Sequence, residues 1–445
     1  MTGSIFNRKT VAVVFGELSR WDVKFFASRL ASRYPLVQLE PLIQERNEKV
    51  RLFNFPETIF RILGVSNTIG VFHAYDARGD EINQPYKRVQ AGDFFYNPYR
   101  VNVGSLGIVP PSLDNGFVSP AYVVFSVDES KVAPQLLESI LTSRWFNLRL
   151  RAATTGSVRQ NLTYSLLGSL AIPLPPLPVQ NEIIAYLQRF EAGVGKAIEQ
   201  LDAVPEKLHL RLVAAYKKEC RHDAIRSRVF ALTFEDFSTW DVKSGRAASF
   251  RLACPSFRPM GDFIEDATDL IHPAAEPDKD WPVYGVNNKE GVFLNSHQKG
   301  STFNAPYKRI RKDWFFHNPT RCNVGSLGIV PAVPEDAITS PEYQVWHLKQ
   351  DIPAPLLPGY VACLIQTPFF LELIQFNRVG AVKQRMYTEN LMQVRIPYIP
   401  IPEQEKYADA REKALAELAV AKHRLNQARQ EVEAMILGVK KVVIL

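Results

Sequence analysis

The nonapeptide NVGSLGIVP occupies Asn102 to Pro110 and recurs unchanged at Asn323 to Pro331. A run of identities this long, 221 residues apart from Asn102 to Asn323, indicates an internal duplication. The match extends upstream at the same offset, where PYKRVQAGDFFYNPYR precedes the first copy and PYKRIRKDWFFHNPTR precedes the second. Because there are only two copies and the period is domain-sized, the pattern predicts a duplicated domain rather than a solenoid.

Further segments repeat downstream in the same order. SPAYVVF at Ser119 pairs with SPEYQVW at Ser340, and GSVRQ at Gly156 pairs with GAVKQ at Gly380. Short β-rich runs bounded by Gly, Pro and Asn predict strands within each copy. The runs 135–150 and 360–376 have helical periodicity, and Pro368 should interrupt the second. Each copy is therefore predicted to be a mixed α and β globule.

The composition sets the broad class. The 445 residues are 46% hydrophobic and carry a net charge of +7, which fits a soluble globular protein of two or three domains that tolerates a polyanionic partner. The start, MTGSIFNRKT, lacks an apolar signal-peptide core, and prolines interrupt the apolar run after Leu166, so we expect a cytoplasmic protein. The four cysteines show no C-x-x-C or His-spaced pattern, which predicts reduced thiols and no metal site.

A long helix should follow each copy, after IPLPPLPVQ at Ile172 and IPYIPIPEQ at Ile396. In the second, apolar residues from Ala414 to Met435 step alternately by four and three, which is the heptad spacing of a helix packed on another helix. Pro205 should kink the first helix. The residues predicted to line the helix seam or a partner surface are Ile198, Leu201, Leu208, Leu418, Leu425 and Val432.

Taken together, the order of globule and helix, with G-[SA]-V-[RK]-Q and a proline-rich I-P run before each helix, resembles the specificity (S) subunit of Type I restriction-modification systems. The resemblance implies an α+β protein in which two similar target recognition domains are separated by two long antiparallel coiled-coil helices with pseudo-twofold symmetry. The implied boundaries are target recognition domains at 1–177 and 223–401, with spacer helices at 178–222 and 402–438.

The resemblance also implies the function. Each domain would bind one half of a bipartite double-stranded DNA target, and two methyltransferase subunits, with restriction or translocase subunits joining later, would perform the chemistry. S-adenosylmethionine, and ATP with Mg²⁺ for restriction, are expected in those partners and no cofactor in this chain. A related Type IIB-like system and a methyltransferase-binding regulator or decoy remain as alternatives.

Catalysis by this chain is not indicated. YNPY at Tyr96 and HNPT at His317 are similar to the N-P-P-[YF] loop of amino-methyltransferases but lack its second proline, and no cofactor-binding glycine motif precedes them. No Walker A or H-E-x-x-H motif is present. Single histidines of this kind are more often core or surface residues than ligands.

Candidate DNA contacts fall into two groups. Basic and hydroxyl residues shared by both copies suit phosphates, whereas the divergent segments 73–84 and 294–305, flanked by matching sequence, carry donors and acceptors suited to base edges. An ordinary surface, or for NVGSLG a tight structural turn, would explain the same residues. The candidates are Arg78, Asn83, Lys87, Arg88, Arg100, Ser105, Arg159, Gln160, Asn295, Gln298, Lys299, Lys308, Arg309, Arg321, Ser326, Lys383 and Gln384.

Overall fold

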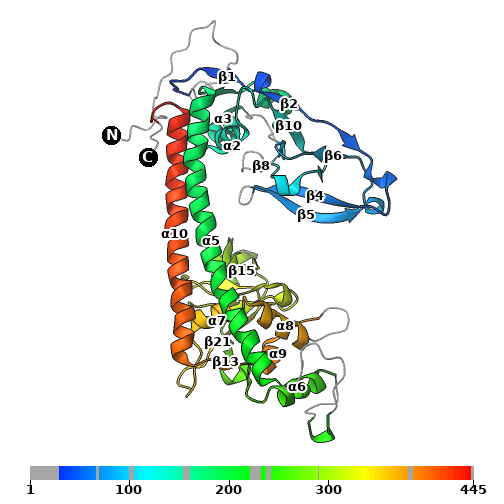
Figure 1. Ribbon diagram of the computed structural model, residues 1–445, viewed down its shortest axis with the longest axis vertical. Coiled ribbons are helices and arrows are strands. Elements are labelled where there is room, and N and C mark those ends of the chain that lie inside the picture. Colours follow the sequence, from blue (N-terminus) through cyan, green and yellow to red (C-terminus); the bar gives the residue numbers. More distant parts are fainter. Residues whose placement is uncertain are drawn as a thin grey trace. The chain divides into compact units, whose positions relative to one another are not determined.

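The computed structural model describes residues 30–66, 70–99, 105–153, 161–220, 232–236, 242–288, 290–378 and 384–441. The chain divides into two compact units (Figure 1). Unit 1 comprises Met1–Val194 and Ala421–Leu445, and unit 2 comprises Gly195–Val420. Because both boundaries fall inside the long helices, each of these helices contributes one part to each unit.

Unit 1 contains a four-stranded sheet of order β2-β10-β7-β8, a five-stranded sheet of order β3-β6-β9-β4-β5 and the antiparallel pair β1-β11. Nearly all of these pairings are antiparallel, with β4 and β9 parallel. The strands are β1 (Leu36–Gln38), β2 (Ile43–Glu45), β3 (Lys49–Val50), β4 (Ile59–Ser66), β5 (Gly70–Arg78), β6 (Tyr86–Val89), β7 (Phe94–Tyr96), β8 (Leu106–Ile108), β9 (Gly116–Val118), β10 (Val123–Val127) and β11 (Ala171–Pro173).

Unit 2 repeats this topology strand for strand. Its sheets have the orders β13-β21-β18-β19, β14-β17-β20-β15-β16 and β12-β22. The strands are β12 (Arg258–Pro259), β13 (Ile264–Asp266), β14 (Leu270–Ile271), β15 (Asp280–Asn287), β16 (Gly291–Lys299), β17 (Tyr307–Arg309), β18 (Phe315–His317), β19 (Leu327–Ile329), β20 (Ile338–Thr339), β21 (Gln344–Leu348) and β22 (Arg395–Ile396). The prediction of a duplicated mixed α and β domain is confirmed.

The helices also correspond between the units. They are α2 (Pro134–Thr142), α3 (Arg144–Ala153), α4 (Tyr164–Gly168) and α5 (Leu177–Glu219), matched by α7 (Pro358–Leu364), α8 (Pro368–Asn377), α9 (Thr388–Gln393) and α10 (Ile401–Ile436), with α6 (Val242–Ala253) preceding the second set. Pro368 separates α7 from α8 as predicted, and the run 135–150 is likewise broken, at Ser143.

No single helix in the described ranges is long and apolar enough to cross a membrane. Helices α7 and α8 reach that composition only as a pair, which bends by 76°. Most of their apolar side chains are buried in the core of unit 2.

The repeated nonapeptide holds the two larger sheets of each unit together. Gly107 of β8 faces the β5 strand so closely that a Cβ atom on it would lie 3.1 Å from Val71 Cγ2, and a Cβ on Gly328 of β19 would lie 3.1 Å from Val292 Cγ2. Gly325 adopts a left-handed conformation with φ of 86°, which favours glycine. The described part of the nonapeptide, from Ser105 in unit 1 and complete in unit 2, is therefore part of the structural frame, since its glycines permit a close approach of the strands.

A buried glutamine fixes the start of each long helix. The Gln180 side-chain oxygen accepts a hydrogen bond from Ala133 N at 2.9 Å, and its amide donates to Lys131 O and Pro175 O. Gln404 forms the same set, accepting from Leu357 N and donating to Pro355 O and Ile399 O. Both glutamines are fully buried. The glutamine of the proline-rich motif therefore joins the helix start to the loop that leads into α2 or α7.

The long helices run antiparallel, because Tyr186 near the start of α5 hydrogen-bonds Glu431 near the end of α10, and Arg211 late in α5 pairs with Glu403 early in α10 at 2.8 Å. Helix α5 continues through Pro205. On α10 the predicted seam residues Leu418 and Val432 are buried and Leu425 is half-buried.

The predicted seam of α5 needs one correction. Leu208 is buried and Leu201 half-buried, but Ile198 is 42% exposed, and its neighbour Ala197 is buried instead. The buried and half-buried positions Val194, Ala197, Leu201, Val204 and Leu208 keep the three-and-four step of a heptad. The prediction chose Ile198 because it has the larger side chain, and the seam position is in fact Ala197, one residue earlier.

The expectation of four reduced thiols is wrong for one pair. Cys220, directly after α5, forms a disulfide with Cys254, directly after α6. Cys322 and Cys363 are free and buried. The bonded cysteines lie 34 residues apart, a spacing that matches no short motif and that only the packing of α6 on the end of α5 brings together.

Replacing either buried glutamine should destabilise the unit that contains it. Gln180→Ala or Gln404→Ala leaves buried backbone groups without partners, at a cost of roughly 1–3 kcal/mol in free energy of unfolding. Chemical denaturation followed by circular dichroism measures this loss. The exposed Gln188→Ala on α5 is the matched control and should change stability by less than about 0.5 kcal/mol. Equal effects of Gln180→Ala and Gln188→Ala would contradict the assigned role.

Candidate nucleic-acid interface

Lys87 and Lys308, the lysines shared by the two copies, form hydrogen bonds within their own units. Lys87 on β6 is 6% exposed and its ammonium donates to Tyr122 O at 2.8 Å. The half-buried Lys308 on β17 donates to Tyr343 O, also at 2.8 Å. Burial lowers the pKa of both ammonium groups. Each lysine connects a strand to the turn formed by the repeated S-P-x-Y sequence, and the phosphate contact predicted for both stays a prediction.

The shared serines are also internal. Ser105 is 8% exposed and Ser326 is 5% exposed. Their backbone carbonyls accept hydrogen bonds from Asn97 N and Asn318 N, respectively, at 3.1 and 3.0 Å. Both residues are therefore buried at the joint between β7 or β18 and the loop that follows, and the phosphate contact predicted for them stays a prediction.

The adjacent arginines are more accessible. Arg88 and Arg309 are half-buried, and each reaches a neighbouring loop: Arg88 hydrogen-bonds Asn115 Oδ1, and Arg309 donates to Glu335 O. Both guanidinium groups retain further N–H donors for an anion. Their predicted DNA contact stays a prediction.

In unit 2, the fold brings two predicted segments together. The Arg378 guanidinium donates to Thr320 O and Gln384 O, and Met386 N donates to Pro319 O. The exposed Arg321 and Gln384 therefore flank a common edge. The exposed Arg385 lies directly after Gln384 and was not selected from the sequence. We call Arg321, Arg378, Gln384 and Arg385 the basic edge.

The comparison of the two copies within the sequence missed part of this edge, because Arg378 and Arg385 lie just outside the repeated G-[SA]-V-[RK]-Q motif. The signal that could have found them is the density of arginines flanking that motif at 378–385. The predicted contacts Arg100, Arg159, Gln160 and Lys383 lie outside the described residues.

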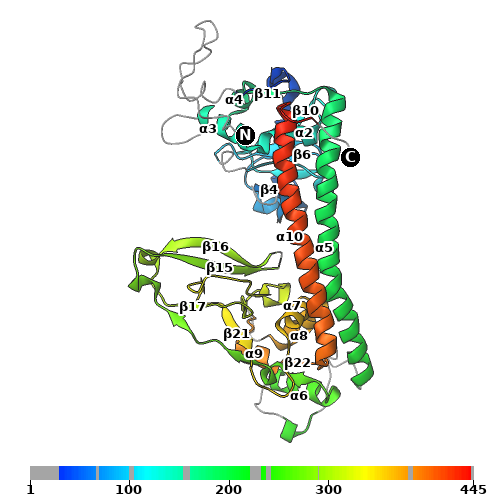
Figure 2. The same cartoon turned by 90° about the vertical axis from the view of Figure 1, so that its left-hand side faces the viewer.

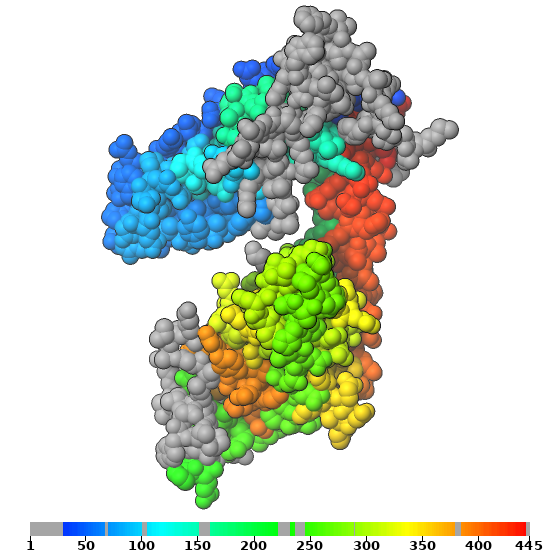
Figure 3. All heavy atoms as spheres, turned by 180° about the vertical axis from the view of Figure 1, so that it is seen from behind, coloured from blue at the N-terminus to red at the C-terminus, as the bar shows by residue number. Residues whose placement is uncertain are grey.

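The divergent segments form an exposed edge strand and the short turn after it in each unit. Strands β5 and β16 are terminal in their five-stranded sheets; β5 is labelled in Figure 1 and β16 in Figure 2. From residue 73 to 76 every side chain of β5 is exposed, and on β16 Leu294, Asn295, His297 and Lys299 are exposed. Figure 3 shows the blue residues of unit 1, which include the β4–β5 hairpin, at the molecular surface.

Several of these polar groups already have partners. Arg78 pairs with Glu57 at 3.0 Å and with Asp80 at 3.2 Å, and Lys299 pairs with Asp280 at 3.3 Å. The half-buried Gln298 donates to Ser296 Oγ, whereas Asn83 is exposed. Because exposed ion pairs contribute little, a ligand of either charge could exchange with them at small cost.

His317 has a structural explanation. The ring is fully buried, with Trp346 Nε1 donating to its Nδ1 and its Nε2 bonded to Met386 O at 2.9 Å. Burial lowers its pKa to about 4. Tyr96, at the same place in unit 1, donates its hydroxyl to Leu162 O. The histidine is thus a neutral core residue that carries no methyltransferase chemistry.

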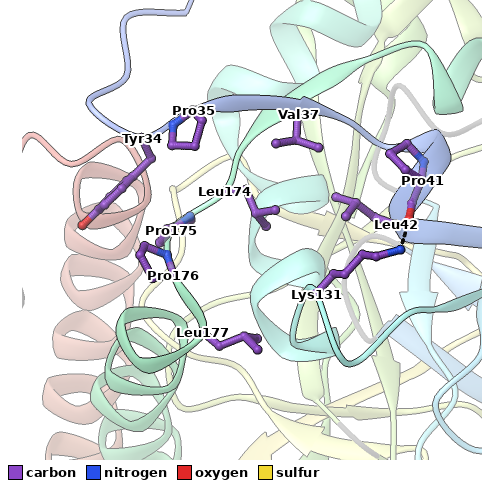
Figure 4. Close-up of a pocket in the computed structure, with 10 residues that line it drawn as sticks. All are labelled: Tyr34, Pro35, Val37, Pro41, Leu42, Lys131, Leu174, Pro175, Pro176 and Leu177. Atoms are coloured by element: carbon purple, nitrogen blue, oxygen red, sulfur yellow. Dashed lines mark hydrogen bonds between the residues drawn. The ribbon is translucent and has the colours of Figure 1, made fainter.

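An apolar cavity of about 480 Å³ lies in unit 1 beside the start of α5 (Figure 4). It is lined mainly by prolines and aliphatic side chains, with Lys131 at its edge. That lysine pairs with Asp128 and donates to Pro41 O. This lining offers no set of donors for a phosphate or a base.

Acid should destabilise unit 2 through His317. Its folded pKa of about 4 lies below the unfolded value of about 6.5, so the stability that the neutral ring contributes is present above pH 6.5 and is lost as the pH falls through 4. At pH 4 this loss amounts to about 3 kcal/mol. His317→Tyr, which introduces the residue of unit 1, should reduce the difference in unfolding free energy between pH 7 and pH 4. The exposed His297→Gln is the control and should leave that difference unchanged. If His317→Tyr kept the wild-type difference in unfolding free energy, the assignment of the acid sensitivity to His317 would be refuted.

No protein-family model matches the chain, and no curated protein matches it significantly. Solved structures do match. They include the HsdS subunit from Thermoanaerobacter tengcongensis, with 15% identity, 92% coverage of this chain, 96% coverage of that chain and a TM-score of 0.34. The S subunit of the Type I restriction-modification system of M. genitalium matches with 12% identity, 91% and 96% coverage, and a TM-score of 0.36.

A third structure, from work on complex assembly and conformational transition of the type I R-M system, matches with 14% identity, 92% and 97% coverage, and a TM-score of 0.33. These TM-scores are below 0.5, so the likeness by itself assigns no function. Two of these three structures are S subunits of Type I restriction-modification systems, the family that the repeated motifs of this sequence resemble, and the third comes from work on such a system.

Proposed function

We propose that this chain is a sequence-specific DNA-binding specificity subunit that reads a bipartite target and directs partner methyltransferase and restriction subunits to it. One observation carries the proposal. The two units share their buried frame, which includes Ser105 and Ser326, yet differ along the exposed edge strands β5 and β16. A common frame with different exposed polar residues suits two half-sites that share a backbone and differ in bases.

The chemistry of duplex DNA supports the same proposal. The double helix is nearly twofold symmetric, so two equivalent domains can present equivalent surfaces to two half-sites. A two-stranded β-ribbon fits the major groove, where each base pair has its own pattern of donors and acceptors. The β4–β5 and β15–β16 hairpins have that form. The basic edge of unit 2 would bind phosphates beside such a hairpin.

The proposed role is non-catalytic. Methyl transfer, with S-adenosylmethionine, and ATP- and Mg²⁺-dependent restriction would belong to the partner subunits, in the cytoplasm. The described residues contain no group of three or more side chains suited to a metal ion. The same surfaces would serve a Type IIB-like system, whereas a regulator or decoy would bind a methyltransferase without selecting a DNA sequence.

Reconstitution tests this proposal. The full chain, a methyltransferase co-expressed with it, and their mixture are each incubated with duplex DNA and S-adenosylmethionine, and modified positions are mapped by sequencing. Modification at a bipartite sequence only in the mixture is expected. Modification by this chain alone would indicate an enzyme, and a mixture that modifies no defined sequence would favour the decoy.

The basic edge should contribute affinity without sequence selectivity. Arg321→Ala and Arg385→Ala should weaken binding to all duplexes alike, because each removes a phosphate contact, and each should reduce the slope of log affinity against log salt by about 0.9. Fluorescence anisotropy at several salt concentrations measures both quantities. Arg424→Ala, an exposed arginine on α10, is the control. A loss confined to one DNA sequence would contradict a phosphate role.

A further inference from the structure

A β-bulge occurs at the same place in both edge hairpins. In unit 1, Ile62 pairs with Tyr75 and Leu63 pairs with His73, which leaves Ala74 without a cross-strand partner. In unit 2, Val283 pairs with Ser296 and Tyr284 pairs with Leu294, which leaves Asn295 in the equivalent position. A bulge bends its strand and redirects side chains, so its presence at one position in both units marks a common structural feature.

The bulge lies where each edge strand leaves the core. Before it, Val71 and Val292 pack against the cores that lie between the two larger sheets. After it, side chains on the same face as those valines become exposed. We call this the outer face; its members are His73, Asp76 and Arg78 in unit 1 and Leu294, His297 and Lys299 in unit 2.

A contact in unit 1 is consistent with this geometry. His73 Nε2 lies 2.9 Å from Asp76 Oδ1, although residues three apart in a regular strand point to opposite faces. The extra residue, Ala74, returns both side chains to the outer face. The bulge therefore sets which side chains of the edge strand meet an incoming ligand.

The two bulge residues differ in what they can bind. Asn295 is exposed, and within the described residues its side chain makes no hydrogen bond, so its amide donor and acceptor are both available. Ala74 is also exposed but has no polar group. An asparagine amide can pair with adenine N6 and N7 in the major groove.

We infer that the bulge residue determines base specificity, and that Asn295 reads an adenine in the half-site bound by unit 2, while Ala74 gives unit 1 no such hydrogen bond. This inference rests on the proposed function. It separates Asn295 from the basic edge, because a base contact changes selectivity whereas a phosphate contact changes affinity alone.

Selection from a pool of duplexes with randomised positions tests the inference on the full chain. Bound DNA is sequenced for the wild type, Asn295→Ala, Ala74→Asn and the control Asn426→Ala, which removes an exposed asparagine of α10. Asn295→Ala should lose selectivity by roughly 5- to 100-fold at one A·T pair of one half-site. Ala74→Asn should gain selectivity at the matching position of the other half-site.

The outcomes are distinct. A wild type that selects no sequence overturns both the inference and the proposed function. A wild type that selects a bipartite sequence, with Asn295→Ala selecting it unchanged, overturns only the inference. A loss of affinity in Asn295→Ala that is equal for all DNA sequences would overturn the inference and assign this residue to a phosphate contact. Thermal unfolding of each variant at the wild-type temperature excludes a folding defect as the cause of any change.

Discussion

The structure of each unit depends on the close approach of its two larger sheets. Gly107 and Gly328 have no side chain where β8 and β19 meet the valines of β5 and β16, and a Cβ atom there would be crowded at 3.1 Å from a valine methyl group. This contact anchors the base of each edge hairpin in the core. Beyond this anchor, the edge strands carry exposed side chains, from His73 to Asp76 in β5 and at Leu294, Asn295, His297 and Lys299 in β16. Such an anchor suits the recognition role proposed for the edge strand, since a strand that reads a ligand must hold its side chains in fixed positions.

Shared and divergent residues follow this division. Lys87, Ser105 and their equivalents in unit 2 belong to the frame. A lysine in this environment needs a hydrogen-bond partner, and there is little room for a side chain larger than serine. These two requirements explain why the residues are identical in both copies. The residues on the outer face are exposed and their ion pairs contribute little, so they can change with little loss of stability. Much of the identity between the copies thus lies in the scaffold, and under the proposed function the differing exposed residues are the surface available for specificity.

The long helices obey the same logic. Gln180 and Gln404 each use both amide hydrogens and the side-chain oxygen to hold the helix starts, so the repeated proline-rich motif is a structural joint. Beyond the joint, packing of apolar residues at heptad spacing governs the helices. A buried Ala197 beside an exposed Ile198 shows that the position on the helix, rather than side-chain size, decides which residue is buried.

The sequence alone determined the duplication, the mixed α and β class, the break at Pro368 and the heptad of α10, because these follow from local spacing or from direct comparison of the two copies. Only the tertiary structure decided that Lys87 points inward, that Cys220 meets Cys254, that His317 is a core residue and that Arg378 joins Thr320 to Gln384. It also placed Asn295 at a bulge. Each of these depends on residues brought together from distant parts of the chain, and the periodicity of a single segment holds no information about its distant neighbours.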